Sequence, residues 1–281
     1  MANAVATRQK TGITTYLSNE AVKKNIMSVI GEKGTQKFIS SVVSAVQANP
    51  ALAECSNSSI LSAALLGESL NLTPSPQMGQ FYLVPYQDKE RGSQAQFQIG
   101  YRGYVQLAVR SGQYRKIVAS EVKDGEIVSY NPITEEFTLK PILDMKTRES
   151  LPTVGYYAMF ELTNGFRKEL YWSREQMEAH ARRYSKGYAK DLQKHTAYTF
   201  WSKDFSSMAL KTLLRQLISK WGIMSIEMEK GFAGDMGVIN EDGTVDYIDN
   251  KVTPEDVIES HQDEVTENAN TVDIEVEGDF T

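Results

Sequence analysis

The chain has 281 residues, of which 41% are hydrophobic and 23% charged, so it can bury a substantial core and has the composition of an ordinary globular protein. Its single cysteine, Cys55, excludes an intramolecular disulfide and a zinc site built from several cysteines. The N-terminal stretch MANAVATRQK has no apolar signal core, and no apolar run is long enough to span a bilayer. We therefore expect a cytoplasmic protein with no membrane partner.

The charge of the chain is divided between its two parts. From Gly231 onward there are fifteen acidic residues against one basic residue, Lys251, a balance of −14. Residues 1–230 carry the remaining 29 basic and 21 acidic residues, a balance of +8. A basic body with an acidic tail is common in proteins that handle nucleic acids, although a solubilising tail on an unrelated domain has the same composition.

Composition and periodicity predict four regions in chain order. Residues 1–18 show little periodicity and are expected to form a mobile arm. Residues 19–70 contain three helical patterns, the second ended by Asn49-Pro50 and the third capped by Ser58-Ser59, and predict an N-terminal helical lobe. Residues 71–230 mix strand and helix patterns and form the predicted core. Residues 231–281 are the predicted acidic tail, largely disordered, with one short helix possible from Thr253.

Short strand patterns dominate the first part of the predicted core. Residues 81–86 and 94–99 read as a hairpin, and residues 117–122 and 126–130 read as another around Asp124-Gly125. Residues 137–139 form a weaker strand pattern. Residues 154–162 and 166–172, joined by Asn164-Gly165, form the clearest hairpin. These short connections predict an α+β fold, in which a small antiparallel sheet with hairpins packs on a long helix.

Helical patterns dominate the second part of the predicted core. Ser173 and Gln176 form a capping-box pattern at the start of one helix. Around Gly187 we expect that helix to loosen into a mobile loop. Residues 196–221 then read as one long helix, with Phe205, Met208, Leu213, Leu217 and Trp221 on its apolar stripe and Lys203, Lys211 and Arg215 on the opposite side.

Residues 94–116 form the most distinctive stretch of the chain. Strict alternation over 94–99 places Gln94, Gln96 and Gln98 on one face of a strand, where solvent exposure and contact with a ligand are equally compatible with the pattern. At Gly100 the period changes to that of a helix, on which Arg102 and Arg110 lie on one face. No acidic residue occurs in this stretch, which is typical of a segment that binds a polyanion.

Three clusters, 101–116, 182–194 and 203–215, combine lysine and arginine with aromatic residues. Cations can neutralise phosphates, and aromatic rings offer faces on which bases stack. The alternative is that the rings belong to the core and the cations to solvated helix faces. For four of the aromatic residues we favour this alternative and expect core packing: Tyr104, Phe200, Phe205 and Trp221. The predicted DNA-binding residues are Arg102, Arg110, Arg115, Lys116, Arg182, Arg183, Lys186, Lys190, Lys203, Lys211, Arg215, Tyr101 and Trp201.

Enzymatic signatures are weak. No phosphate-binding GxxxxGK[ST] loop and no serine-hydrolase elbow occurs, so we expect neither ATP nor a catalytic triad. The best enzymatic alternative is a magnesium nuclease, because Glu121 and Lys123, and likewise Asp144 and Lys146, form acid-x-lysine pairs near strands. Such pairs are frequent by chance. We therefore predict no catalytic residue, no metal site and no cofactor, with Mg²⁺ at most a modulator.

Four blocks of the chain form a recognisable succession: LNLTPSPQMGQFYLVPYQ (70–87), QFQIGYRGYVQLAVRSGQYRKI (96–117), LYWSREQMEAHARRYS (170–185) and FWSKDFSSMALKTLLRQL (200–217). Together they resemble the RecT family of phage single-strand annealing proteins. The resemblance implies an ATP-independent recombinase that binds single-stranded DNA, anneals complementary strands and assembles into rings or helical filaments, with residues 71–230 as its DNA-binding and annealing core. It also implies that the acidic tail contacts a phage exonuclease or the host single-strand-binding protein.

Annealing requires the pairing edges of both strands to stay free, so the protein should contact phosphates rather than bases. The sequence predicts a basic groove whose floor is formed by residues 94–116 and the helix from Lys203 to Arg215, with Arg182 to Lys194 as a lid or wall. Repetition of the subunit would make this groove continuous. A passive coating protein for single-stranded DNA is the main alternative.

Overall fold

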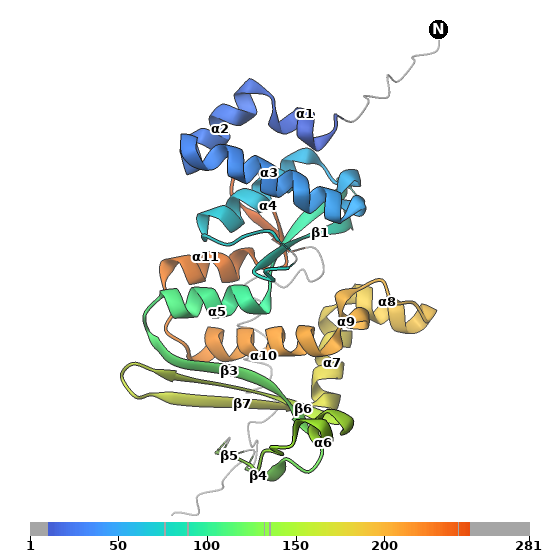
Figure 1. The fold of residues 1–281 in the computed structure, drawn as a ribbon. Coiled ribbons are helices and arrows are strands. Elements are labelled where there is room, and N and C mark those ends of the chain that lie inside the picture. Colours follow the sequence, from blue (N-terminus) through green and yellow to red (C-terminus); the bar gives the residue numbers. More distant parts are fainter. Residues whose placement is uncertain are drawn as a thin grey trace, which may run out of the picture.

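The computed structural model describes residues 11–75, 77–88, 90–131, 133–134, 136–240 and 242–247. Its elements stack in layers, from the N-terminal helices through a four-stranded sheet, a helical layer of α5, α11 and α10, and a three-stranded sheet (Figure 1). Most of the buried apolar side chains form one cluster that runs from Leu17 to Ile239. Within these described residues, no helix is long and apolar enough to cross a membrane. The mixed helical and antiparallel architecture confirms the predicted α+β class.

The N-terminal helices follow the apolar periodicity of the sequence. They are α1 (Ile13–Leu17), α2 (Glu20–Ile30), α3 (Glu32–Ala48), the short 3-10 helix η1 (Pro50–Glu54) and α4 (Asn57–Ser69). The side chain of Ser56, rather than Ser58 or Ser59, caps α4 by accepting a hydrogen bond from the Ser59 amide. The predicted arm is partly folded, because Leu17 in α1 is fully buried; residues 1–10 lie outside the described residues.

The four-stranded sheet joins distant parts of the chain. β1 (Phe81–Asp88) and β2 (Gly92–Ile99) form the predicted hairpin, and β8 (Gly237–Ile239) extends it with β9 (Val245–Tyr247) in the order β1-β2-β8-β9. Gln96 is buried and donates from Nε2 to the carbonyl of Met236 at 2.5 Å. The part of the predicted tail from 231 to 247 is therefore folded, whereas residues 248–281 lie outside the described residues.

The three-stranded antiparallel sheet has the order β3-β6-β7 and one face packed on a long helix. Its strands are β3 (Tyr114–Lys123), β6 (Thr153–Leu162) and β7 (Arg167–Ser173), and the helix is α10 (Phe205–Trp221). The β6–β7 hairpin is the one predicted, with Gly165 at a φ of +87° in the turn. The predicted hairpin around Asp124-Gly125 is wrong, because β3 pairs with β6 over a long separation.

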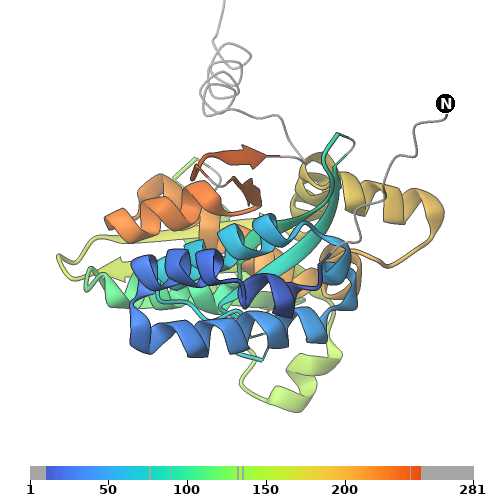
Figure 2. The same ribbon diagram turned by 90° about the horizontal axis from the view of Figure 1, so that it is seen from above.

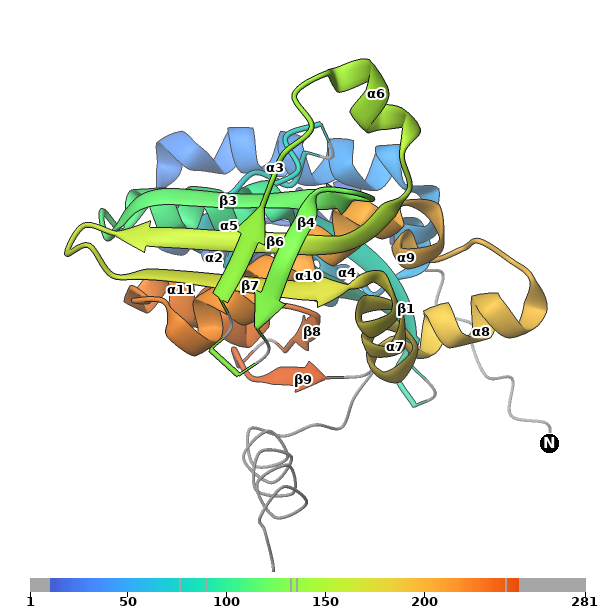
Figure 3. The same ribbon diagram turned by 90° about the horizontal axis from the view of Figure 1, so that it is seen from below.

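Between β3 and β6 the chain makes an excursion, residues 124–152. It contains β4 (Ile127–Asn131), β5 (Glu136–Leu139) and α6 (Met145–Ser150). The β4–β5 hairpin crosses the face of the sheet that α10 does not cover, and α6 lies beyond β3 (Figure 3). The ring of Phe137 stacks on Tyr171 at 4.6 Å between centroids, which attaches the hairpin to the sheet.

A buried carboxylate, Glu126, organises this excursion. It accepts hydrogen bonds from Arg148 Nε at 2.7 Å and from the amides of Lys123 at 2.8 Å and Ile142 at 3.1 Å. Burial alone would raise the pKa of Glu126, but these donors, Arg148 foremost, lower it to about 2. The charged carboxylate therefore fixes α6 and the start of β4 relative to the end of β3.

The remaining helices follow the central strands. They are α5 (Tyr101–Arg110), α7 (Arg174–Tyr184), α8 (Lys186–Lys194), α9 (Phe200–Lys203) and α11 (Ile226–Gly234). The predicted capping box is confirmed at Ser173. Two expectations are wrong. The predicted loop around Gly187 is α8, which projects from one side of the molecule (Figures 1 and 2), and the predicted long helix is interrupted at Asp204, whose side chain caps α10.

Candidate nucleic-acid interface

The N-terminal end of α5 lies beside α9. The ring of Tyr82 in β1 is 5.9 Å from the ring of Phe200, measured between centroids. The pKa of Tyr82 is raised, chiefly by burial, while the charge of Arg102 lowers it and that of Asp204 raises it. Arg102 is exposed, and its Nη1 donates to the carbonyl of Gln77 at 3.3 Å. Two clusters that the sequence separates by about a hundred residues therefore meet here.

Helices α8, α9 and α10 are held together by an aromatic cluster. Tyr188 of α8 lies 6.1 Å from the ring of Trp201 and 6.1 Å from that of Phe205, and Trp201 lies 5.2 Å from Phe205. Trp201 is only 6% exposed. Its prediction as a DNA-binding residue is wrong for this structure, since its ring is packed inside the cluster.

A buried acid, Asp191, fixes the connection between α8 and α9. Its Oδ2 accepts hydrogen bonds from the Thr199 amide, the Thr199 hydroxyl and the Ser202 hydroxyl at 2.7–2.8 Å. Burial would raise the pKa of Asp191, but these donors hold it well below its usual range. The position of α8 relative to α9 is thus set by packing and hydrogen bonds.

Six predicted cations lie exposed on this side of the molecule. We call them the cationic surface: Arg102, Arg182, Arg183, Lys186, Lys190 and Lys203. Arg182 pairs with Glu178 one turn earlier at 2.5 Å, and Arg183 lies 5.3 Å from the ring centre of Tyr184. Tyr198 and Phe200 are also exposed here. The expectation that Phe200 belongs to the core is wrong; the N-capping pattern at Asp204 is the sequence signal that could have revealed it.

Lys211 and Arg215 do not belong to this surface. Lys211 is 6% exposed, and its Nζ lies 3.3 Å from Asp235 Oδ1. Arg215 Nε lies 3.4 Å from Asp235 Oδ2. Burial lowers the pKa of Lys211, although Asp235 opposes this effect. The predicted groove floor along this helix is therefore wrong for Lys211, because its ammonium is enclosed in the core and paired with a carboxylate.

Asp235 connects four elements. Besides the two cations, it accepts hydrogen bonds from the Ile99 amide at 2.8 Å and from the Tyr104 hydroxyl at 2.5 Å. Burial and the charge of Asp235 raise the pKa of Tyr104 well above its usual value, so the phenol remains a donor. Tyr104 is fully buried, as predicted. Asp235 was assigned to the acidic tail by composition, so its partners could not be recognised from the sequence.

Three other predicted cations lie at the opposite end of α5 and the beginning of β3. Arg110 donates from Nη2 to the Leu70 carbonyl at 2.6 Å and so caps the end of α4. Arg115 pairs with Glu161 at 3.2 Å, and Lys116 is exposed on the same strand. Tyr101, at the start of α5, is half-buried and packs against the core. The residues predicted for one groove therefore lie in three places. Some are near the N-terminal end of α5, some are at its C-terminal end and the start of β3, and some are in the core.

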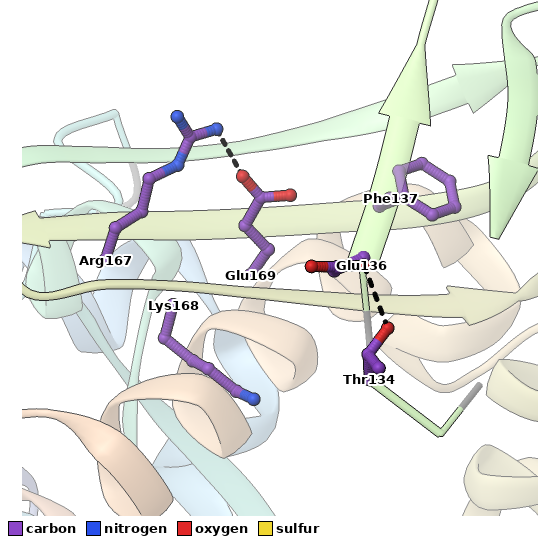
Figure 4. Close-up of a pocket in the computed structure, with 6 residues that line it drawn as sticks. All are labelled: Thr134, Glu136, Phe137, Arg167, Lys168 and Glu169. Atoms are coloured by element: carbon purple, nitrogen blue, oxygen red, sulfur yellow. Dashed lines mark hydrogen bonds and ion pairs between the residues drawn. The ribbon is translucent and has the colours of Figure 1, made fainter. Parts of the chain in front are cut away.

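Two surface hollows lie elsewhere. One, of about 330 Å³, is bounded by the tip of the β4–β5 hairpin and by β7, where Arg167 pairs with Glu169 and Thr134 donates to Glu136 at 3.2 Å (Figure 4). The other, of about 310 Å³, is lined by serines of α4, Arg91 and β8. Opposite charges balance in the first hollow, and Arg91 in the second pairs with Asp246 at 2.8 Å.

The acids of the nuclease alternative have structural partners. Glu121 pairs with Lys123 at 2.7 Å, and the Asp144 side chain caps α6 through the Thr147 amide at 3.0 Å. Hydrogen bonds from Lys123, Ser206 and Thr153 lower the pKa of Glu121 against the effect of burial. Among the described residues, no group of three histidine, cysteine or acidic side chains could hold a metal ion. Both acids of the nuclease alternative are thus engaged in contacts within the fold.

Comparison with known proteins identifies the family to which this chain belongs. The RecT family model matches residues 36–258, and the chain is 39% identical over 246 residues to the uncharacterized protein YqaK of Bacillus subtilis (strain 168), covering 87% of this chain and 78% of the relative. The chain belongs to the RecT family. This RecT family protein is also 26% identical over 254 residues to the protein RecT of Escherichia coli (strain K12), covering 89% of this chain and 88% of that protein.

Family membership confirms the resemblance carried by the four sequence blocks, and it supports DNA binding and single-strand annealing in recombination. The match begins within α3 and continues beyond β9, so it includes the cationic surface and the Asp235 contacts. In this RecT family protein, exposed cations that could neutralise phosphates and exposed rings that could stack on bases lie around α5 and α7–α9.

Proposed function

We propose that this protein binds single-stranded DNA on the cationic surface and anneals complementary strands without nucleotide hydrolysis, in phage homologous recombination in the host cytoplasm. The observation that carries this proposal is that Arg102 and Phe200 both lie beside Tyr82, so that the basic start of α5 is close to α9. Lysine and arginine contact phosphates and leave the Watson–Crick edges free. The exposed rings of Tyr198 and Phe200 add base stacking that is independent of sequence.

Strand comparison then depends on base pairing between the strands, as it does in guide-directed systems. A flexible strand held by its phosphates can present its bases to a second strand. Nothing in this process requires bond making or breaking by the protein, so we propose no catalytic residue, no ATP and no metal. Self-association, as expected for a RecT family protein, would place successive cationic surfaces along one strand.

A fluorescence assay with two complementary labelled oligonucleotides, without nucleotide, tests this function. We expect pairing to be faster with the protein than without it, in EDTA as well as in Mg²⁺, with both oligonucleotides recovered at full length. Binding without acceleration would instead identify a passive coating protein. Shortened oligonucleotides in Mg²⁺ that are absent in EDTA would identify a nuclease.

We further propose that residues 248–281 serve as a docking segment for a phage exonuclease or the host single-strand-binding protein. These residues contain eleven acidic residues and one basic residue, which suits a basic partner surface. A truncation after Tyr247 retains Asp235 and β9, and it should lose partner binding in a pull-down while strand affinity at low salt stays unchanged. If the truncated protein binds strands more tightly, the segment competes with DNA for the cationic surface instead.

A further inference from the structure

The β6–β7 turn end of the three-stranded sheet exposes a group of apolar side chains. They come from the end of α5, the turn itself, the end of α10 and the start of α11: Val109, Phe166, Trp221, Ile223 and Ile226. Ile226 is 72% exposed. Exposed apolar residues that gather at one place typically mark an interaction surface.

Specific contacts hold these segments together at the turn end. The hydroxyl of Tyr114, at the start of β3, donates to the carbonyl of Ile223 at 3.0 Å. Lys168 Nζ lies 4.4 Å from the centre of the Trp221 ring, and the ring of Phe166 lies 6.1 Å from that of Phe160. Figures 1 and 3 show the β6–β7 turn and α11 at the same end of the sheet. The expectation that Trp221 belongs to the core is wrong, and its ring is part of this surface.

The excursion exposes a second apolar group. It comprises Ile127 and Val128 in β4, Leu143 just before α6 and Met145 in its first turn, whereas the exposed Ile133 lies apart at the hairpin tip, beside β7. Leu143 is 85% exposed. The buried Glu126–Arg148 pair holds the start of β4 and α6 in place, so this apolar group is presented by a fixed segment.

Strand topology places the two groups at opposite ends of the sheet. β3 begins beside the turn end and leads into the excursion, whereas β6 leaves the excursion and ends at the turn. Each of these strands has 10 residues, which corresponds to about 33 Å at ~3.3 Å per residue. A copy displaced along the strands would therefore bring the turn end of one molecule to the excursion of another.

The two ends carry net charges of opposite sign. Outside the hairpin tip, residues 124–131 and 139–152 contain four acidic and three basic residues. The segments 109–116, 163–169 and 219–226 at the turn end contain six basic residues and one acidic residue. Opposite charge around apolar centres favours contact between unlike ends and disfavours contact between like ends.

We propose that the turn end of one subunit binds the excursion of the next, in a head-to-tail contact between copies of this chain. The two surfaces differ, so the contact is heterologous and generates a ring or an open filament. This inference rests on the proposed function in one respect, which is that the protein associates with itself. None of the six cations of the cationic surface belongs to either end, so the contact leaves that surface open to DNA.

Two double variants test this contact. Ile223→Ser/Ile226→Ser alters only the turn end, and Leu143→Ser/Met145→Ser alters only the excursion. In sedimentation velocity with the full-length protein, free and on a single-stranded oligonucleotide, each variant alone should need about tenfold or more protein for half-assembly. An equimolar mixture should form two-subunit complexes, because the intact excursion of the first variant can bind the intact turn end of the second. These complexes should not grow, because the two surfaces left over both carry substitutions.

A matched control is Met27→Ser/Val29→Ser on α2, which removes the same number of exposed apolar side chains elsewhere. It should assemble as the unsubstituted protein does. The proposal is overturned if the unsubstituted protein stays monomeric with and without DNA, if either test variant assembles normally, if the mixture stays monomeric, or if the control loses assembly equally. Binding of a short oligonucleotide, measured on the variants, reports on the proposed function separately, because their cationic surface is intact.

Discussion

The double substitution Arg102→Glu/Lys203→Glu should lower the affinity for a single-stranded oligonucleotide about 100-fold at low salt. Each change removes a phosphate partner and adds a repulsive charge at the junction of α5 and α9. Loss of two phosphate contacts should also reduce the slope of log affinity against log salt by roughly 1.4, at ~0.7 per contact for single strands. Fluorescence anisotropy across a salt series measures both quantities, and the annealing rate should fall in parallel.

The control for net charge is Lys24→Glu/Lys37→Glu, on α2 and α3. Both lysines are exposed and far along the chain from the cationic surface, and the change in total charge is identical. Affinity and salt slope should change little in this control. Equal losses in the two double variants would show that overall charge, rather than the α5–α9 junction, determines binding, and the assigned surface would then be incorrect.

The second large effect concerns stability. Asp235→Ala should lower the free energy of unfolding by about 3–5 kcal/mol, the usual cost of removing one partner from a buried ion pair. The substitution leaves the Lys211 ammonium enclosed without its carboxylate, and it removes the acceptor of the Ile99 amide and the Tyr104 hydroxyl. Urea unfolding followed by circular dichroism measures this change.

Two comparisons isolate the cause. Asp246→Ala removes an exposed acid that pairs with Arg91 at 2.8 Å, and an exposed pair of this kind contributes at most about 1 kcal/mol. Adding Lys211→Met to Asp235→Ala should recover part of the lost stability, because no buried ammonium then remains unpaired. If Asp235→Ala is no more harmful than Asp246→Ala, the buried network does not stabilise the fold as described.

These contacts also explain why charge reversal at Lys211 is a poor test of DNA binding. A glutamate at this position would face Asp235 inside the core, so loss of binding would follow from unfolding. Arg102 and Lys203 are better choices because both side chains are exposed.

Local signals were sufficient for much of the fold. Asn164-Gly165 predicts the β6–β7 turn, and Ser173 with Gln176 predicts the start of α7, because turn and cap preferences depend on a few neighbouring residues. The pairing of β3 with β6 depends on residues about forty positions apart, so the nearer Asp124-Gly125 signal was misleading. The apolar periodicity of a single helix likewise does not show which other elements pack on each of its faces.

The candidate site shows the same limit. Arg102 could be selected from charge and helical spacing, and the structure places it beside Tyr82, whose ring lies 5.9 Å from that of Phe200 in α9. The burial of Lys211 could not be foreseen, because its partner lies in a stretch whose composition resembles a solvated tail. Exposure of Phe200 depends on the short helix α9, which ends where Asp204 caps α10.

The contacts of Asp235 also bear on the order in which the molecule folds. They join Asp235 to Tyr104 and Ile99 at sequence separations of 131 and 136 residues. Contacts of such large sequence separation form late and slow the folding reaction. During synthesis, α5 and β2 leave the ribosome long before the carboxylate that satisfies their buried donors. The central helical layer can therefore be completed only after almost the whole described chain has emerged.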